Sequence, residues 1–341
     1  RNFARLTFSF ASGEQGTSIF QVVPELNIGA TDHLAFQVKV PYVSASGNLG
    51  ANSGLGDPVI TGSYAFVKQA HQRLDGLLGV KFPANDANAK ANDLPLPMPY
   101  QTGLGTTVLL FGLNYRFKRI TAAIAYQHVL SQGNANGFLH STWNGSADSA
   151  SASGYFESYT LERANDAVVR AQYAIPIGKL AVQPGLLAIV HLADDTRGIG
   201  EGTTQRITIE NSAGLTLNLT VDARYSLSGT WTLEAAYGSP LVTREVRPDG
   251  LTRSMVLNLG LRFAFASCQQ INDSWFVAHR AAAAEPDLDF FMHLGDYVYV
   301  SDTSTLSLED YRECYRRWRR QPYLRDLHAA LPVVAMWDDG E

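Results

Sequence analysis

Cysteine is nearly absent from this chain: its 341 residues contain only two, Cys268 and Cys314. Two cysteines cannot form a disulfide framework. Both lie in the last quarter, so the first 267 residues contain none. A cysteine-free stretch of that length suits a protein that passes through an oxidising periplasm.

Long apolar runs and an excess of positive charge are also lacking. No run of 18 or more apolar residues occurs, so no transmembrane helix is expected. The net charge of −5, with only 17% of residues charged, argues against a nucleic-acid partner, which would normally require a basic domain. A β-barrel stays possible because its alternating strands average to unremarkable hydropathy. The chain begins at Arg1 without a signal peptide, so we interpret it as a mature chain or a fragment.

Alternation of apolar and polar residues dominates residues 1–265. From Leu215 to Leu227 every second residue is apolar, and the residues between them are polar, a pattern typical of strands. A soluble sandwich would bury the apolar face, whereas a membrane barrel turns it toward lipid and keeps the polar face in the lumen. We expect about twelve strands, near residues 3–11, 17–28, 33–43, 57–68, 73–83, 104–117, 120–130, 165–176, 179–191, 215–228, 230–238 and 254–265.

The lengths of the connections favour the barrel over the sandwich. Short connections alternate strictly with long ones, as periplasmic turns and extracellular loops do in outer-membrane barrels. The long ones are expected at 44–56, 84–103, 131–164, 192–214 and 239–253. We expect the Gly/Ser/Asn-rich segment 131–164 to be exposed and mobile. The sequence therefore predicts an all-β fold, an antiparallel outer-membrane up-and-down β-barrel of about 12 strands that contacts the lipid bilayer.

Several segments of this region resemble a known family. They are TDHLAFQVKVPYV (31–43), SGLGDPVITGSYAF (53–66), LLGVKFPAND (77–86) and GLGTTVLLFGLNYRF (103–117). Over roughly residues 17–265 the chain is similar to the outer-membrane barrels of the phenol-degradation MetA-pathway family, a group of channels. The resemblance implies passage of small solutes, with aromatic or apolar ones among the candidates. Asp57, in its most specific element, either caps a turn or faces the pore.

Polar residues on the alternating strands are candidates for the channel lining. They include Lys39, Asn114, Arg116, Asp222, Arg224 and Arg262. Their mixed signs argue against strong ion selectivity. Polar packing inside a narrow barrel is the alternative interpretation. The region shows no catalytic constellation, its histidines have no ligand spacing, and we expect no cofactor for the barrel.

After residue 265 the pattern changes to that of an α/β protein. FFMHLGDYVYV (290–300) and LPVVAMWDDGE (331–341) are apolar strand candidates that end in acids, and a helix is expected over 308–320. Carboxylates at the ends of parallel strands meet at one edge of a sheet, where a shared carboxylate can bridge two metal ions. The arginines that end the helix either face solvent or approach phosphate.

FAFASCQ (263–269), DLDFFMHLGDYVYV (287–300) and residues 308–341, in that order, resemble the amino-terminal part of the catalytic domain of PhoD-like alkaline phosphatases. The resemblance implies hydrolysis of phosphate esters at an iron–calcium centre, in an exported protein. By this resemblance Cys268 would be a thiolate ligand of iron, Asp296 would bridge the metals and Tyr299 would bind iron. Asp338 and Asp339 fall in the family's Trp-Asp-Asp-His-Glu motif.

This second region departs from its family in two ways. Gly340 stands where the family has histidine, and the sequence stops at Glu341, before the family's remaining ligands. We therefore expect an incomplete α/β metallophosphatase fragment that is inactive as written, with a phosphate ester as substrate only if the domain were complete.

The two resemblances overlap at Phe263–Phe265 with no linker between them. We divide the chain into 1–265 and 266–341, with the barrel in the outer membrane and the C-terminal segment in the periplasm. Three hypotheses remain: a channel that carries an incomplete phosphatase segment, a barrel that tethers a phosphatase, and a chimera of two genes. We expect the barrel to take residues 254–265 and Cys268 to lie just outside it, without metals.

Overall fold

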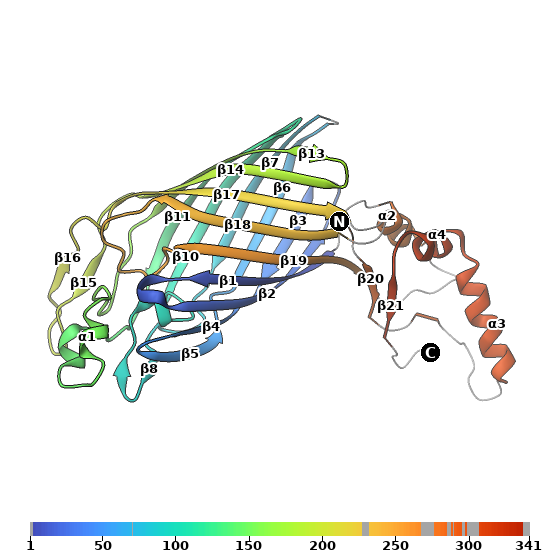
Figure 1. Cartoon of the computed structure of the whole chain (residues 1–341). Helices are drawn as coiled ribbons and strands as arrows, with labels where there is room; N and C mark the ends of the chain where they lie inside the picture. Colours follow the sequence, from blue (N-terminus) through green and yellow to red (C-terminus); the bar gives the residue numbers. More distant parts are fainter. Residues whose placement is uncertain are drawn as a thin grey trace. The chain divides into compact units, whose positions relative to one another are not determined.

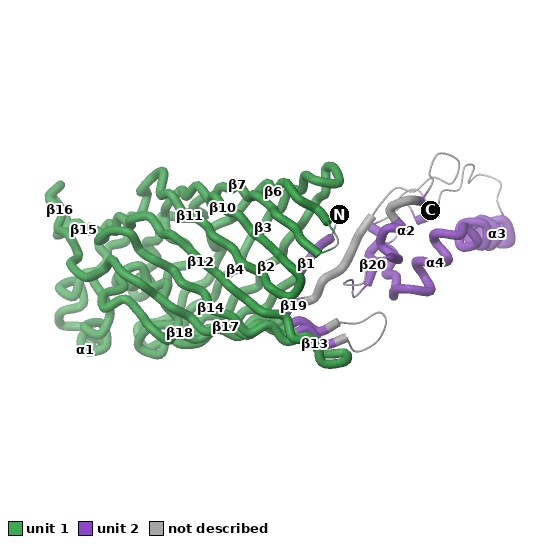
Figure 2. Tube along the Cα trace, turned by 90° about the horizontal axis from the view of Figure 1, so that it is seen from above, with its two compact units in different colours: residues 1, 6–223, 235–259 green, residues 2–5, 224–234, 260–341 purple. Residues whose placement is uncertain are grey.

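The computed structural model describes residues 3–69, 71–226, 232–266, 276–284, 288, 290–294, 297–298 and 307–336. The chain divides into two compact units (Figure 2). Unit 1 comprises residues 1, 6–223 and 235–259, and unit 2 comprises residues 2–5, 224–234 and 260–341.

A closed antiparallel barrel of twelve crossings forms the first part of the chain within the described residues (Figure 1). β1 pairs with both β2 and β19, which closes the sheet. The crossings are β1 (Phe3–Ser12), β2 (Ser18–Gly29), β3 with β4 (Leu34–Lys39, Tyr42–Gly47), β5 with β6 (Gly50–Leu55, Val59–Lys68), β7 (Gln72–Lys81), β10 (Thr106–Phe117), β11 (Ile120–Gln132), β12 with β13 (Asp166–Tyr173, Ile175–Ile177), β14 (Leu180–His191), β17 (Gly214–Ser226), β18 (Thr232–Val242) and β19 (Met255–Ala266). The barrel fold expected from the alternating pattern is thus confirmed.

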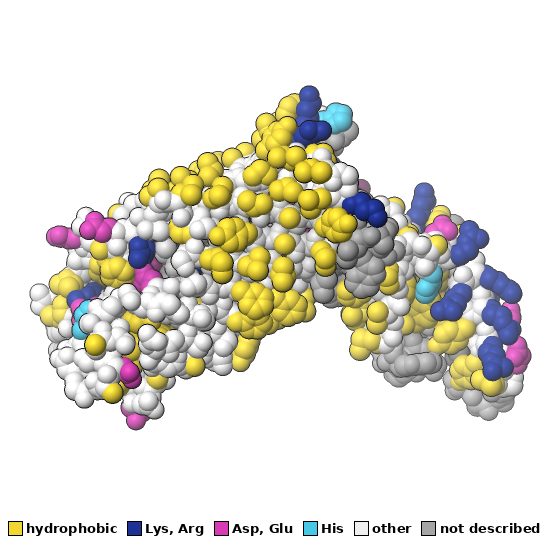
Figure 3. Space-filling model, viewed as in Figure 1, with side chains coloured by type: hydrophobic (Ala, Val, Ile, Leu, Met, Phe, Trp, Pro, Cys, Tyr) yellow, Lys and Arg dark blue, Asp and Glu magenta, His cyan; other side chains and the backbone are white. Residues whose placement is uncertain are grey.

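The alternating residues give the wall two chemically different faces. On β10, Phe111, Leu113, Tyr115 and Phe117 are exposed, and apolar side chains cover much of the outside of the barrel (Figure 3). β10 and β11 run for 12 and 13 residues, more than the roughly nine to eleven that cross a bilayer at a tilt. No described helix is long and apolar enough to span a membrane.

The expected long loop at 44–56 is instead a β-hairpin, and that expectation was wrong. β4 pairs with β5 from Tyr42↔Leu55 to Gly47↔Gly50, across a two-residue turn. Val43 and Ala45 are buried and alternate with small polar residues. Small residues of this kind resemble loop composition, although they keep the period of two that a strand requires.

The other long connections carry short elements. They are β8 (Lys90–Ala91), β9 (Leu94–Pro95), η2 (Met98–Tyr100), η3 (His140–Trp143), α1 (Ser149–Ala152), β15 (Thr196–Gly198) and β16 (Arg206–Thr208), with η1 (Glu14–Gly16) between β1 and β2. In Figure 1 β8, α1, β15 and β16 gather at one end of the barrel, and the turn after β13 lies at the other. We call these the long-loop end and the short-turn end.

Segment 131–164 contains a packed core beside exposed residues, which corrects part of the expectation for it. Phe138, Trp143 and Tyr155 are at most 2% exposed and form one apolar cluster with Leu96 and Tyr100 of another loop. The indole nitrogen of Trp143 donates to Pro95 O at 2.9 Å. The sequence showed no periodicity here because this core forms between loops and not along one helix or strand.

Unit 2 contains a short parallel sheet with helices. β20 (Phe290–His293) pairs in parallel with the end of β19 and with β21 (Val333–Ala335). α2 (Val277–Ala283), α3 (Leu308–Arg319) and α4 (Pro322–Ala330) connect these strands. α3 begins at a capping box in which Ser307 accepts a hydrogen bond from the Asp310 backbone, as such boxes do. The helix expected over 308–320 is confirmed.

The seam between the two sequence patterns lies inside one strand. β19 is continuous from Met255 to Ala266, and in unit 2 its last four residues pair with β20 from Phe263↔Phe290 to Ala266↔His293. The expected barrel strand and the expected first phosphatase strand are therefore the same strand. A strand can serve successive partners along its length, since each residue forms its own ladder bonds.

Substituting Gly185 by alanine should destabilise the barrel. A Cβ atom there would lie 2.4 Å from Ala171 O on β12, and overpacking of this kind costs about 1–3 kcal/mol. The urea midpoint of the folded, heat-modifiable band on gels measures the effect. Gly238→Ala is the matched control, because its Cβ would meet only Leu219 O at 3.9 Å. Equal urea midpoints for the two variants would contradict the close approach of β12 to Gly185 of β14.

Candidate functional site

The inner face of the wall carries five of the six lumen candidates. Exposed apolar side chains mark the outer face of each strand, and the residues between them point to the opposite face. Asn114 and Arg116 alternate with Leu113 and Tyr115, which are exposed. By the same rule Lys39, Asp222 and Arg224 point inward. The sixth candidate, Arg262, has its backbone in β19, and its side chain lies outside the described part of the structure.

Lys39 is neutralised by a neighbour on the adjacent strand. Its Nζ lies 3.2 Å from Glu25 Oε2, and Gln37 Nε2 donates to Glu25 Oε1 at 2.7 Å. Glu25 pairs directly with Lys39 in the ladder between β2 and β3. Opposite charges at directly paired positions attract across a sheet, so this part of the lumen carries no net charge.

The inward charges of β17 are compensated in the same way. Asp222 Oδ2 accepts from Arg170 Nη2 at 2.8 Å and from Gln172 Nε2 at 2.7 Å. Arg224 Nη2 donates to Glu234 Oε1 at 2.9 Å. The sequence identified one member of each pair and missed the partners, which are acids and bases at inward positions of nearby strands.

The lumen around these pairs is open to water. The side chains of Lys39, Arg170 and Asp222 are 40%, 39% and 32% exposed although they point into the barrel. Such values require solvent inside the wall. We therefore describe the lumen at these pairs as a hydrated channel lined by balanced charges.

At the long-loop end the loops form a packed core. The apolar cluster around Tyr100 and Tyr155 is buried, and the two phenol oxygens lie 3.0 Å apart. Tyr155 Oη also lies 3.0 Å from Thr17 Oγ1. Because these contacts join segments that are more than 50 residues apart in the chain, they hold the loops together at the long-loop end.

A buried set of charges lies at the same end, which we call the ionic network. Its members are Arg163, Asp166, His191, Asp195, Arg244 and Asp249. Their side chains are all between 0% and 7% exposed. Buried charges are stable only when they are paired and hydrogen-bonded, so the contacts within this set decide its stability.

Asp249 is the centre of the ionic network. Its Oδ2 accepts from Arg163 Nη2 at 2.9 Å and from Arg244 Nη2 at 2.8 Å, and its Oδ1 accepts from Leu251 N. Burial alone would raise the pKa of Asp249, but the two guanidinium groups outweigh it and hold the pKa well below its ordinary value. Asp249 therefore stays ionised at any pH at which the protein works.

His191 joins two further acids of the ionic network. Its Nδ1 lies 2.6 Å from Asp166 Oδ1 and its Nε2 lies 2.7 Å from Asp195 Oδ1. Arg163 Nη2 also reaches Asp166 Oδ2 at 3.2 Å. This set could not be predicted from the sequence, because its residues come from two strand ends and three loops.

Asp57 anchors loops and does not line the open lumen. Its two carboxylate oxygens accept from Ala84 N at 3.1 Å and Leu104 N at 3.0 Å. Lys81 Nζ lies 3.7 Å away. Of the two roles left open by the sequence, capping of backbone N–H groups is the one that the structure shows.

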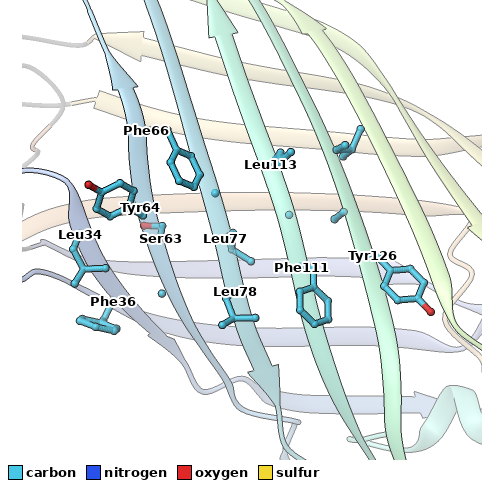
Figure 4. Close-up of a pocket in the computed structure, with 15 residues that line it drawn as sticks. Leu34, Phe36, Ser63, Tyr64, Phe66, Leu77, Leu78, Phe111, Leu113 and Tyr126 are labelled. Atoms are coloured by element: carbon cyan, nitrogen blue, oxygen red, sulfur yellow. The ribbon is translucent and has the colours of Figure 1, made fainter.

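An apolar groove of about 790 Å³ lies on the wall across β3, β6, β7, β10 and β11 (Figure 4). Gly62 and Gly76 form part of its floor, and the ring of Phe66 covers Gly76. Most of its side chains, such as Phe36 and Phe111, belong to the exposed apolar face. The groove thus lies mainly on the outer surface of the wall.

The metal ligands implied by the second resemblance fall outside the described residues. They are Cys268, Asp296, Tyr299, Asp338 and Asp339. Among the residues that are described, no group of three or more His, Cys, Asp or Glu could hold a metal ion. Their fit to iron and calcium thus stays a prediction, and we derive no chemistry through those metals.

Unit 2 also holds a buried histidine that the sequence did not single out. His279 of α2 is 3% exposed, and its ring packs edge-on against Phe276 and tilted against Phe291. Burial is the main cause that lowers the pKa of His279, to about 4. The ring is therefore neutral near pH 7 and acts as a core residue.

A closed antiparallel barrel with an apolar outer face and a polar lumen is the architecture of transmembrane β-barrels. An outer membrane channel from Pseudomonas putida F1 has a similar fold, with a TM-score of 0.51 and 15% identity over 76% of this chain and 94% of that one. The KdgM porin matches more weakly, with a TM-score of 0.40 and 7% identity over 77% of this chain and 99% of the porin. The first likeness establishes the fold, and the second adds nothing to it.

Residues 263–341 match the family of PhoD-like phosphatases. Alkaline phosphatase D of Bacillus subtilis (strain 168) is 38% identical over 97 residues, which cover 24% of this chain and 16% of that protein. The matching stretch thus spans about a sixth of the length of this relative. Both resemblances expected from the sequence, to outer-membrane barrels and to PhoD-like phosphatases, are confirmed.

Breaking one inward charge pair should change ion selectivity in a direction set by the residue removed. Asp222→Asn leaves Arg170 unpaired and should favour anions, whereas Arg170→Gln leaves Asp222 unpaired and should favour cations. We expect shifts of roughly twofold to fivefold in the permeability ratio, since partly exposed pairs contribute up to about 1 kcal/mol. Reversal potentials in a salt gradient measure them. The double variant should return to the parent ratio, and identical ratios in all four proteins would contradict a lumen position for the pair.

Proposed function

We propose that this barrel lies in the bacterial outer membrane and conducts small solutes without net charge, with apolar and aromatic ones among them. The observation that carries the proposal is that three inward charges of the hydrated lumen have partners of opposite sign. Lys39, Asp222 and Arg224 each have an opposite charge within 3.2 Å. A pore that selects ions normally presents a ring of one sign, and balanced pairs attract neither sign.

Apolar residues on the inner face support this choice of solute. Gly112 of β10 pairs with Leu77 of β7 and with Ala125 of β11, so the three share the face on which Asn114 lies. Leu77 is 38% exposed there. A half-exposed leucine in a water-filled lumen offers an apolar solute a surface that water solvates poorly.

The orientation that we propose follows from the lengths of the connections. Outer-membrane barrels place short turns in the periplasm and long loops outside the cell. The long-loop end would then face the exterior and the C-terminal segment would lie in the periplasm. The apolar outer face of the barrel would contact the acyl chains of the bilayer.

Liposome swelling by the full chain tests the channel. Glucose, glucosamine and glucuronate have the same ring and carry no charge, one positive charge and one negative charge. We expect glucose to enter at least about twofold faster than either charged sugar, because charge compensation leaves the charged ones without a favourable site. Empty liposomes are the control. Faster entry of a charged sugar than of glucose would contradict the proposal, and so would an absence of swelling with every sugar at every pH between about 6 and 9.

A second candidate function concerns the C-terminal segment. The parallel pairing of β19, β20 and β21, together with the family match of residues 263–341, favours the beginning of a phosphatase domain carried by the barrel. In a chain that contains the rest of that domain, iron and calcium would be the cofactors and a phosphate ester the substrate. DNA reads across codons 255–275 distinguish such a fusion, which predicts continuous coverage, from a chimera of two genes.

A further inference from the structure

We propose that the ionic network is a pH-responsive latch that holds the loops closed over the long-loop end of the barrel. This inference rests on the proposed channel function, because a latch has a use only where there is a passage to close. It adds a regulatory element that the fold alone does not require.

The barrel has both a hydrated and a water-excluded region. Arg170 and Asp166 both point inward from β12, four residues apart, yet their side chains are 39% and 7% exposed. Water therefore reaches the lumen at Arg170 and is excluded at Asp166. The boundary between the two regions coincides with the ionic network.

The ionic network joins three loops. Arg163 lies near the end of the loop before β12, Asp195 lies in the loop after β14, and Asp249 lies in the loop between β18 and β19. Arg244 adds a contact between the last two, since its Nη1 donates to Ser212 O at 2.8 Å. Release of these contacts would free all three loops together.

The contacts of His191 determine its protonation state. Both of its ring nitrogens lie within 2.7 Å of carboxylate oxygens, which in their ionised form only accept hydrogen bonds. The ring must then donate from both nitrogens, which makes it an imidazolium. With that charge, three cations face three carboxylates and the buried set is neutral.

Among the described residues, the side chains that bond to the His191 ring are Asp166 and Asp195. Further charges lie near the network, Lys81 near Arg163 and Asp166, and Arg253 and Glu14 near Asp249. Asp166 faces it from β12 and Asp195 from the following loop, while Arg163, Arg244 and Asp249 complete the set. The arginines stay charged at every relevant pH. Loss of one proton from His191 therefore leaves one uncompensated negative charge and one carboxylate contact without its hydrogen.

The direction of the response follows from this charge count. At low pH the imidazolium is present and the latch is closed. As the pH rises and the imidazolium loses its proton, the buried set becomes negative and the loops are released. Because unpaired buried charge is strongly unfavourable, we expect release to be steep.

The test uses the full chain and two readings across about pH 6 to pH 9, the range around histidine titration. Trypsin cleavage after Arg163 and Arg244 reports loop release, since both side chains are buried when the latch is closed. Conductance in planar bilayers reports passage. We expect cleavage, corrected for the activity of trypsin on a peptide, to rise at least about tenfold, and conductance to rise with it.

His191→Gln removes the titratable charge and should be cleaved rapidly at every pH. His71→Gln is the matched control, since His71 is exposed in a short turn at the other end of the barrel. If His191→Gln does not fold, the pH dependence of trypsin cleavage in the parent protein still tests the latch. Heat-modifiable migration on gels shows whether each variant forms a barrel.

The possible outcomes distinguish failure of the latch from failure of the proposed channel. Cleavage that rises with pH in a protein that never conducts would support the latch and overturn the proposed channel. Conductance with cleavage that does not change with pH would leave the channel intact and overturn the latch. A variant His191→Gln that is as resistant as the parent at high and low pH would also overturn the latch.

Discussion

Two arginines that share one buried carboxylate hold the long-loop end of this protein together. Asp249 accepts hydrogen bonds from Arg163 and Arg244 with its side chain fully buried, and the other contacts of the ionic network extend from this centre. Buried ion pairs add little net stability, but loss of one partner typically costs about 3–5 kcal/mol. The pairing therefore specifies one arrangement of the loops and penalises every other arrangement.

The rest of the barrel follows from the demand that backbone groups in a membrane be satisfied within the sheet. Closure of β1 on β19 removes the free edges, and alternation then sends apolar side chains outward and polar ones inward. Inward charges are tolerated where a neighbouring strand supplies the opposite sign, as Glu25 does for Lys39. Charges inside the barrel are thus accommodated in two ways. In the hydrated lumen they form partly exposed pairs, and in the ionic network they form buried pairs.

The fold could be predicted from the sequence because strands have a fixed period. All twelve crossings were expected near the residues where they lie, since Leu215–Leu227 and similar segments repeat every second residue. The β4–β5 hairpin and the packing of Trp143 were missed, because small residues and loop cores show no period. Inward charges such as Asp222 were identified, whereas the ionic network was not, since only the folded loops bring Arg163, His191 and Asp249 together.

The most direct measurement is the accessibility of the lumen from each side of the membrane. The variant Asn114→Cys places a thiol at an inward position, and Cys268 and Cys314 are both replaced by serine. A membrane-impermeant maleimide is then added near neutral pH. The account predicts no labelling in intact cells and full labelling once the reagent reaches the periplasm. Cysteine at the exposed loop residue Asp148 is the control and should be labelled from outside. Equal labelling of Asn114→Cys in intact and permeabilised cells would contradict closure at the long-loop end.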